Sequence, residues 1–133
     1  MAKCETHGHL RGVGDRCMFC NRAMEPLRMS GSQMIDNERT RQIESEGWTA
    51  AHDDEHTECQ LLDAAICYAG MSGSLVMDPD SGSEARIGLM EVWPWEPSWW
   101  KPSNDPIRNL VKAGALIAAE IDRMQRKSEA DKS

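Results

Sequence analysis

Residues 105–126, DPIRNLVKAGALIAAEIDRMQR, carry the clearest helical signal in the 133-residue chain. Asp105 is a typical N-cap residue, and Pro106 stands at the first helical position, where proline is favoured. Apolar residues then recur at intervals of three and four, which predicts one buried stripe on one helix. A glycine within this stripe costs about 1 kcal/mol relative to alanine, so we expect another helix to cross close to Gly114. The stripe consists of Ile107, Leu110, Val111, Gly114, Ile117, Ala118, Ile121 and Met124.

Two earlier helices are also expected. The stretch NERTRQIESE contains strong helix formers as far as Gly47, which suits the position after a helix end, so we predict a helix over about residues 34–46. Thr57 followed three residues later by Gln60 is a capping-box pattern. It precedes a helical apolar face that we expect Gly70 to end. This face consists of Leu61, Leu62, Ala65, Ile66 and Ala69.

The composition divides the chain into four parts. Residues 1–28 form a Cys- and His-bearing module, 29–36 a linker, 37–126 a helical domain and 127–133 a disordered tail. Within the domain, MDPDSGSEARIG is interpreted as an exposed turn or a small hairpin. We therefore predict a mainly α fold: a small three-helix domain with a long Trp/Pro-rich loop, plus an N-terminal zinc-knuckle module. Because three helices bury little surface alone, two copies can pair as a homodimer.

The charge distribution narrows the classes of partner. The formal net charge is −7: residues 1–28 hold five Lys/Arg against three Asp/Glu, and the remainder holds ten against nineteen. So acidic a domain disfavours generic binding to nucleic acid. No apolar run approaches the roughly 20 residues of a membrane span, so we expect no membrane partner. The N-terminal stretch lacks the apolar core of a secretory signal, which predicts a cytoplasmic protein without a disulfide framework.

The strongest local motif is a pair of metal-ligand spacings. Cys4-x2-His7 is followed by Cys17-x2-Cys20, as in two knuckles that close a tetrahedral zinc site. Four protein ligands leave no open position, so the predicted Zn²⁺ is structural. His9 is an alternative fourth ligand, and free thiols are the alternative interpretation of the whole segment. The remaining cysteines, Cys59 and Cys67, are expected to be buried apolar residues.

An acidic, His-bearing turn is the second candidate site. His52, Asp53, Asp54 and His56 lie within five residues, and the two histidines would point the same way in a helical turn. Neighbouring carboxylates could then complete a site for Mg²⁺ or Mn²⁺, which makes these four residues the candidate catalytic group. The alternative is a solvated loop that caps the adjacent helices.

Tryptophan is concentrated in the third feature. Four of the five Trp lie between residues 93 and 100, where prolines favour extended backbone. With one Phe and one Tyr in the chain, two or three of the rings are expected in the core. The others would offer flat faces to a base or a protein partner. In a nucleotide hydrolase, Lys101, Arg108 or Lys112 would contact the phosphate. The candidate ligand-binding residues are Trp48, Trp93, Trp95, Trp99, Trp100, Lys101 and Arg108.

Three runs between about residues 36 and 126 resemble a family of short proteins encoded by tailed phages and prophages. They are ERTRQIESEGWTAAHDDEH, LLDAAICYA and VWPWEPSWWKPSNDPIRNLVKAGALIAAEIDRM. The resemblance implies a phage accessory protein in the host cytoplasm and carries over no catalytic residue. A looser resemblance is to all-α nucleotide pyrophosphohydrolases, which hold Mg²⁺ with Glu-x-x-Glu and Glu-x-x-Asp pairs. This chain departs from them, since it has Glu58 with Asp63, and Glu120-x-Asp122.

These observations leave three hypotheses for function. The favoured one is a non-catalytic binding module that engages a host protein or captures a small nucleotide, in a counter-defence role, with zinc stabilising its N-terminal part. The second is a metal-dependent nucleotide (pyro)phosphohydrolase that uses the His52–His56 turn. The third is a structural accessory protein in which every motif serves the core or a helix cap.

Overall fold

The computed structural model describes residues 2–3, 12–13, 16–17, 25–26 and 28–132, and divides the chain into two units, Met1–Ser30 and Gly31–Ser133. The first unit contains two antiparallel pairs of two-residue strands. They are β1 (Ala2–Lys3) with β4 (Glu25–Pro26), and β2 (Gly12–Val13) with β3 (Arg16–Cys17). The predicted zinc ligands Cys4, His7 and Cys20, and the alternative His9, lie outside the described residues, so the zinc site stays a prediction.

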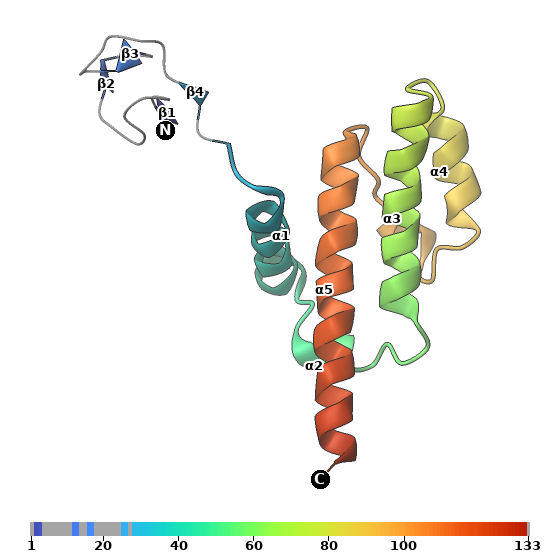
Figure 1. Ribbon diagram of the computed structural model, residues 1–133. Coiled ribbons are helices and arrows are strands. Elements are labelled where there is room, and N and C mark those ends of the chain that lie inside the picture. Colours follow the sequence, from blue (N-terminus) through green and yellow to red (C-terminus); the bar gives the residue numbers. More distant parts are fainter. Residues whose placement is uncertain (1, 4–11, 14–15, 18–24, 27, 133) are drawn as a thin grey trace. The chain divides into compact units, whose positions relative to one another are not determined.

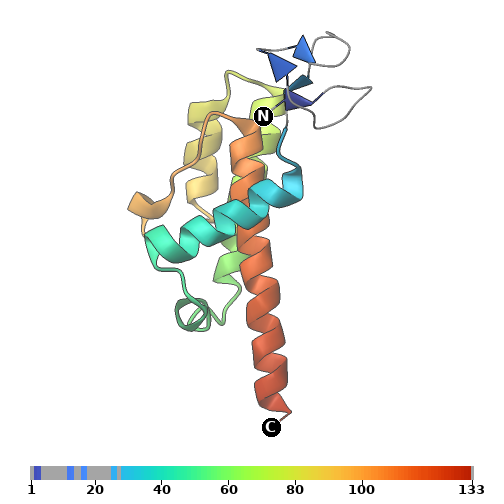
Figure 2. The same cartoon turned by 90° about the vertical axis from the view of Figure 1, so that its left-hand side faces the viewer.

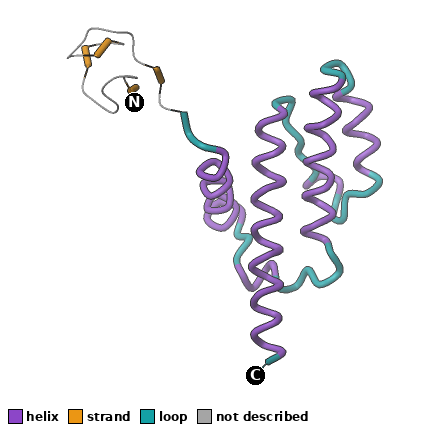
Figure 3. Tube along the Cα trace, in the orientation of Figure 1, coloured by secondary structure: helices purple, strands orange, loops and turns teal. Residues whose placement is uncertain are grey.

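The second unit is helical, which confirms the mainly α class. Its α-helices are α1 (Gly31–Glu46), α2 (Ala50–Asp53), α3 (Gln60–Met77), α4 (Gly82–Met90) and α5 (Pro106–Asp131), with the 3₁₀ turn η1 at Pro97–Trp99. Helices α3 and α5 lie side by side and antiparallel, with α4 beside α3 (Figure 1). Helix α1 crosses α5 (Figure 2), and irregular loops join the helices (Figure 3). Two short helices, α2 and α4, thus add to the three that were predicted.

Local capping chemistry sets the ends of α1 and α5 as expected. The Asp105 side chain accepts a hydrogen bond from the Ile107 amide at 3.0 Å, and Pro106 follows it in the first turn. Gly47 has a φ of +73°, the left-handed conformation common just after a helix end, and the amide of Trp48 donates to the carbonyl of Gln42 at 3.0 Å. The other ends differ, since α1 starts at Gly31 and α5 continues to Asp131.

The region after Gly70 differs from the prediction. Helix α3 passes through Gly70 and ends at Met77, and α4 replaces the expected turn or hairpin. Packing between the two helices explains this, because a Cβ added at Gly70 would lie 3.1 Å from the Leu89 side chain of α4. The glycine therefore serves a close helix contact and does not end the helix.

The predicted capping box at Thr57 is also wrong. Cys59 is the N-cap residue of α3, with a φ of +67° and no side-chain cap. The side-chain oxygen of Gln60 accepts instead from the amide of Glu58 at 2.7 Å. Cys59 is exposed, contrary to expectation, whereas Cys67 is buried and its thiol has a pKa raised to about 11 by burial and by Asp63.

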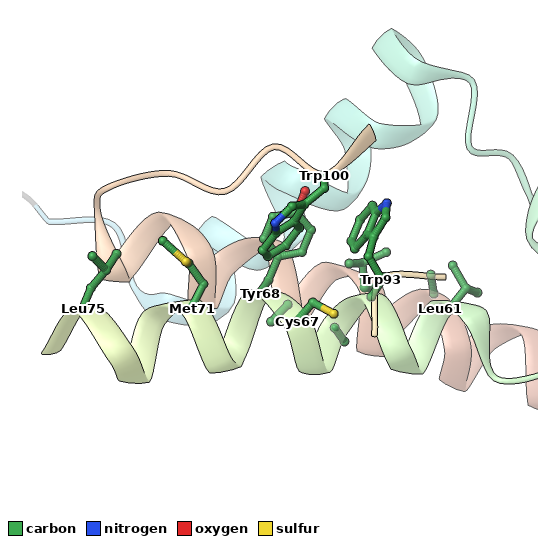
Figure 4. Close-up of a cluster of buried hydrophobic side chains, with 12 residues drawn as sticks. Leu61, Cys67, Tyr68, Met71, Leu75, Trp93 and Trp100 are labelled. Carbon is green, nitrogen blue, oxygen red and sulfur yellow. The ribbon is translucent and has the colours of Figure 1, made fainter. Parts of the chain in front are cut away.

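Tryptophan rings from the loop between α4 and α5 form the centre of the core. Trp93 and Trp100 pack on Tyr68 of α3, with ring centroids 5.7 and 4.9 Å away (Figure 4). Both indole N–H groups donate to backbone carbonyls, Trp93 to Glu96 at 3.0 Å and Trp100 to Arg86 at 2.9 Å. Two of the five tryptophans are thus buried, within the predicted range.

The buried face of α5 is not the predicted stripe. Helix α5 turns Leu116, Ala113 and Ala119 toward the Trp-filled core, whereas five of its other large apolar residues point outward. Ile107, Leu110, Ile117, Ile121 and Met124 are 45–58% exposed. The expected helix crossing at Gly114 is present, since a Cβ there would lie 2.6 Å from Ile35 of α1. The buried residues are Asn109, Val111, Ala113, Ala115, Leu116, Ala119, Glu120 and Arg123.

Candidate functional site

A ring-lined pocket of about 540 Å³ lies between α2 and the Trp/Pro-rich loop. Its volume falls in the range typical of small-molecule sites. The segment at the end of α1 supplies one wall, α2 and the residues after it supply a second, and the loop supplies the rest. The lining residues are Trp48, His52, His56, Pro94, Trp95, Glu96, Pro97 and Trp99.

The indole and imidazole rings of the pocket form a continuous series of contacts. The planes of Trp48 and His52 differ by 4°, with centroids 6.3 Å apart. His52 meets His56 edge to face at 4.9 Å, and His56 lies 5.1 Å from Trp95. Two flat indoles and two polar imidazoles thus face one space, an arrangement suited to a planar heteroaromatic group.

Helix α2 positions the two histidines. The hydroxyl of Thr49 accepts a hydrogen bond from the His52 amide at 3.3 Å and caps this short helix. Asp53 is fully buried and accepts from Arg39 of α1 at 2.6 Å, while its other oxygen lies 3.4 Å from Nδ1 of His52. The buried ion pair therefore fixes α2 against α1 and orients the His52 ring. The prediction that His52 and His56 point the same way agrees with the structure.

Two polar atoms in this ring series are buried without a partner. Nε2 of His56 and Nε1 of Trp95 make no hydrogen bond in the part of the chain that the structure describes. Buried polar atoms without a partner cost about 1–3 kcal/mol each, so they are rare outside functional sites. Burial, aided by the charge of His52, lowers the pKa of His56 below its ordinary value and favours the neutral imidazole.

The carboxylates of the predicted metal turn do not join the histidines. Asp53 points toward α1, and Asp54 points toward α5, where it accepts from Arg126 at 2.8 Å. Within the described ranges, 28–132 above all, no group of three or more His, Cys, Asp or Glu is placed to hold a metal ion. The four residues His52, Asp53, Asp54 and His56 therefore form a ring wall and two ion pairs in this structure.

A second, smaller cavity of about 40 Å³ shares the walls Trp48 and Trp99 with the first. Three cationic side chains and one carboxylate line it, in contrast to the acidic chain as a whole. Neither lysine pairs with a carboxylate among the residues described. The lining residues are Arg41, Gln42, Glu46, Trp48, Tyr68, Trp99, Lys101, Lys112 and Leu116.

The two lysines of the small cavity are held in place by uncharged groups. Lys112 donates to the carbonyl of Lys101 at 2.8 Å, and its Nζ lies 5.3 Å from the Tyr68 ring. Lys101 places its Nζ 5.8 Å from the ring of Trp99. Burial, together with the charge of Arg108, lowers the pKa of Lys112. An anion entering this cavity would compensate a partly desolvated cation.

Gln42 adds a buried polar group to the same cavity. This α1 residue is 2% exposed, and its side-chain oxygen has no hydrogen-bond partner among the described residues. Arg41 donates to Glu38 and Glu46. The small cavity thus combines charge with unused hydrogen-bonding capacity.

Not every predicted binding residue reaches these cavities. Trp93 and Trp100 belong to the core, and Arg108 donates both to Oε1 and to Oε2 of Glu38, at 2.9 and 2.8 Å, which ties α5 to α1. Burial would raise the pKa of Glu38, but the hydrogen bonds from Arg41 and Arg108 outweigh it and lower that pKa. The predicted Trp48, Trp95, Trp99 and Lys101 line the cavities, whereas Arg41, Gln42 and Tyr68 were missed.

Comparison with known proteins adds no relative. No protein-family model, curated protein or solved structure matches the chain. Among the helices described, none is long and apolar enough to cross a membrane.

Proposed function

We propose that the helical unit is a non-catalytic binding module that captures a small nucleotide. The observation that carries this proposal is the ring-lined pocket of about 540 Å³, which shares Trp48 and Trp99 with a cationic cavity. A nucleotide has the same two parts, a flat polar ring and an anionic group at a short distance.

The larger pocket suits the base. Stacking of a base on an aromatic side chain contributes about 1–3 kcal/mol and does not depend on base identity. The partnerless Trp95 Nε1 can donate a hydrogen bond, and Nε2 of a neutral His56 can donate or accept according to its tautomer. Both atoms are shielded from solvent, so a ligand ring reaches them only when the side chains around them shift; it would then recover their desolvation cost, which an apolar ligand cannot do.

The smaller cavity suits the phosphate. Lys101 and Lys112 have no carboxylate partner within the described residues, so a bound phosphate would be their first counter-ion. At about 40 Å³ the cavity has little free space. The phosphate would therefore lie at its mouth, where the exposed Lys101 side chain would contact it together with Lys112. Long-range steering is weak for a chain of net charge −7, which favours a small local anion over a polynucleotide.

Capture is preferred to hydrolysis because the carboxylates are already engaged. A metal-dependent hydrolase needs carboxylates that converge on one ion, whereas Asp53 and Asp54 pair with Arg39 and Arg126 on different sides of α2. The resemblance to short tailed-phage proteins supports an accessory role in the host cytoplasm, where removal of a nucleotide would counter a defence signal. A host protein docking on the same rings is the competing form of binding.

The predicted zinc knuckle would stabilise the first unit of the chain. The spacing of Cys4, His7, Cys17 and Cys20 supports one structural Zn²⁺ for the first unit. Metal analysis of the purified chain should give about one zinc per chain, and the Cys17→Ser/Cys20→Ser variant should lose it. Retention of zinc by that variant would refute the site.

The proposed function is tested by calorimetric titration of the full chain with adenosine, its 5′-monophosphate and a cyclic dinucleotide. We expect a phosphate-bearing compound to bind more tightly than adenosine, and Trp95→Ala to weaken binding about 10-fold or more. Val92→Ala is the matched control, because Val92 is exposed in the same loop and lines neither cavity. It should bind like the wild type.

Chromatography of the same mixtures with Mg²⁺ or Mn²⁺ separates capture from catalysis. Nucleotide that leaves solution on mixing and returns intact on heating supports capture. New nucleotide products formed by the wild-type chain with Mg²⁺ or Mn²⁺ would establish the hydrolase instead. Equal binding by Trp95→Ala and Val92→Ala, or no binding of any compound, would reject nucleotide capture in this pocket.

A further inference from the structure

A second surface, apolar and separate from the pocket, runs along the outer sides of α3 and α5. It contains large apolar residues that are about half exposed, while the opposite sides of both helices pack on the Trp core. We call this surface the outer face. It consists of Leu62, Ile66 and Val76 of α3 and Ile107, Leu110, Ile117, Ile121 and Met124 of α5, which are 41–66% exposed.

The spacing of these residues is that of a coiled-coil seam. On α5 the half-exposed apolar residues lie at 107, 110, 117, 121 and 124, and Gly114, between the second and third of them, contacts Ile35 of α1. On α3 the intervals are four and three at 62, 66, 69, 73 and 76. Such a repeat keeps one stripe toward a partner helix over several turns. Two neighbouring helices, α3 and α5, each carry a stripe of this kind.

Both stripes lie on the same side of the helix pair. Each stripe is displaced by roughly 100–160° around its helix from the residues that face the core, since a residue advances about 100° in an α-helix. Figure 4 shows Tyr68 and Met71 projecting from the side of α3 on which Trp93 and Trp100 lie. In Figure 1, α4 flanks α3, α1 flanks α5, and no described element passes in front of the pair.

The composition of α3 indicates that this side is covered. Asp63 is the only charged residue in its 18 residues, so the helix is apolar or small on nearly every side. Helices of this kind are normally buried all round. Among the described residues, α3 is covered by the core, by α5 and by α4, and its outer side has no such cover.

The size and symmetry of the outer face favour a second copy as the occupant. Eight half-exposed side chains offer on the order of 800 Å², about what each partner contributes to a standard interface and more than monomers usually leave exposed. None of the stripe positions is charged, so the face needs no complementary charge pattern and fits itself about a two-fold axis. We infer that two chains associate through their outer faces, with α3 and α5 of each forming a four-helix interface.

The test is sedimentation velocity of the full chain at about 50 µM. Interfaces of this size commonly have dissociation constants below that concentration. We expect the wild type at twice the chain mass of 14.9 kDa. Ile66→Glu and Ile117→Glu place a charge within each stripe and should raise the dissociation constant by about 30-fold or more. Ile87→Glu is the matched control, because Ile87 of α4 is 67% exposed and outside both stripes. It should remain dimeric.

Helix content by circular dichroism shows whether each variant is folded. If Ile66→Glu unfolds, the double variant Ile117→Ala/Met124→Ala removes apolar area without adding charge and should raise the dissociation constant about 10-fold. A monomeric wild type would overturn the inference. So would folded stripe variants that dimerise as strongly as Ile87→Glu, because the first unit or another surface would then hold the copies together.

Discussion

Trp100 and Trp95 belong to the same short loop but have opposite environments. Trp100 is 1% exposed, packs on Tyr68, and donates its indole N–H to the carbonyl of Arg86. Trp95 lines the pocket, and its indole nitrogen is buried without a partner in the described part of the chain. We therefore assign Trp100 to the fold, because its polar atom is satisfied, and keep Trp95 as the proposed ligand contact, because its polar atom is not.

The largest expected loss of stability comes from substituting Trp100, the core ring of this pair. Trp100→Ala removes a fully buried ring and a hydrogen bond, and should lower the free energy of unfolding by about 3–5 kcal/mol. Trp99→Ala, next to it in the chain, removes a ring that is 48% exposed and should cost about 1 kcal/mol or less. Urea denaturation followed by circular dichroism measures both. Equal losses would contradict the division between core and pocket rings.

The neighbouring carboxylates of Asp53 and Asp54 also differ in burial, and they test the same contrast between core and surface. Asp53 is fully buried and pairs with Arg39, whereas Asp54 is about half exposed and pairs with Arg126. Asp53→Asn leaves a partly buried guanidinium without its counter-ion and should destabilise by about 3 kcal/mol. Asp54→Asn should cost less than about 1 kcal/mol.

The measurement is again the free energy of unfolding, now at two salt concentrations. Salt should reduce the small contribution of Asp54 and leave that of Asp53 nearly unchanged, because buried pairs are screened less. A similar cost for the two substitutions would show that the Asp53 pair does not fix α2 against α1. The orientation of His52 would then need another cause.

The helix ends that the sequence predicted correctly depend on local chemistry. Gly47 ends α1 and Asp105-Pro106 begins α5 through bonds within a few residues. Gly70 does not end α3, because its role is decided by Leu89, which comes from another helix. Periodicity also selected the wrong face of α5, because it could not show which side of the helix packs on the loop tryptophans. That side carries Leu116 and two alanines, and of the predicted stripe only Val111 is buried.

In the candidate site, too, the local features were predicted and those that depend on contacts between distant segments were not. The cluster of tryptophans and the pair His52 and His56 were visible as local concentrations of unusual residues. The structure brings both histidines and two of the clustered tryptophans, Trp95 and Trp99, to one pocket. Gln42 and Tyr68 gave no such signal, because an isolated residue in a helix acquires a role only through the packing of α1, α3 and α5. The division of carboxylates between two arginines likewise depends on contacts between distant segments.

The smallest expected effect concerns His56, the second ring of the pocket with an unsatisfied atom. Its folded-state pKa is lowered by burial and by the charge of His52, so the folded protein favours the neutral ring. Below the ordinary pKa of about 6.5 the unfolded chain takes up a proton that the folded chain does not, and stability falls until the pH reaches the lowered pKa. Acidification from pH 7.5 to 5.5 should therefore cost the wild type about 0.5 kcal/mol more than His56→Gln, a small difference because the ring is partly exposed. An NMR titration checks the cause, with a His56 midpoint below about 6.5. A midpoint at or above about 6.5 in the free protein would contradict the lowered pKa and show that burial does not hold the ring neutral.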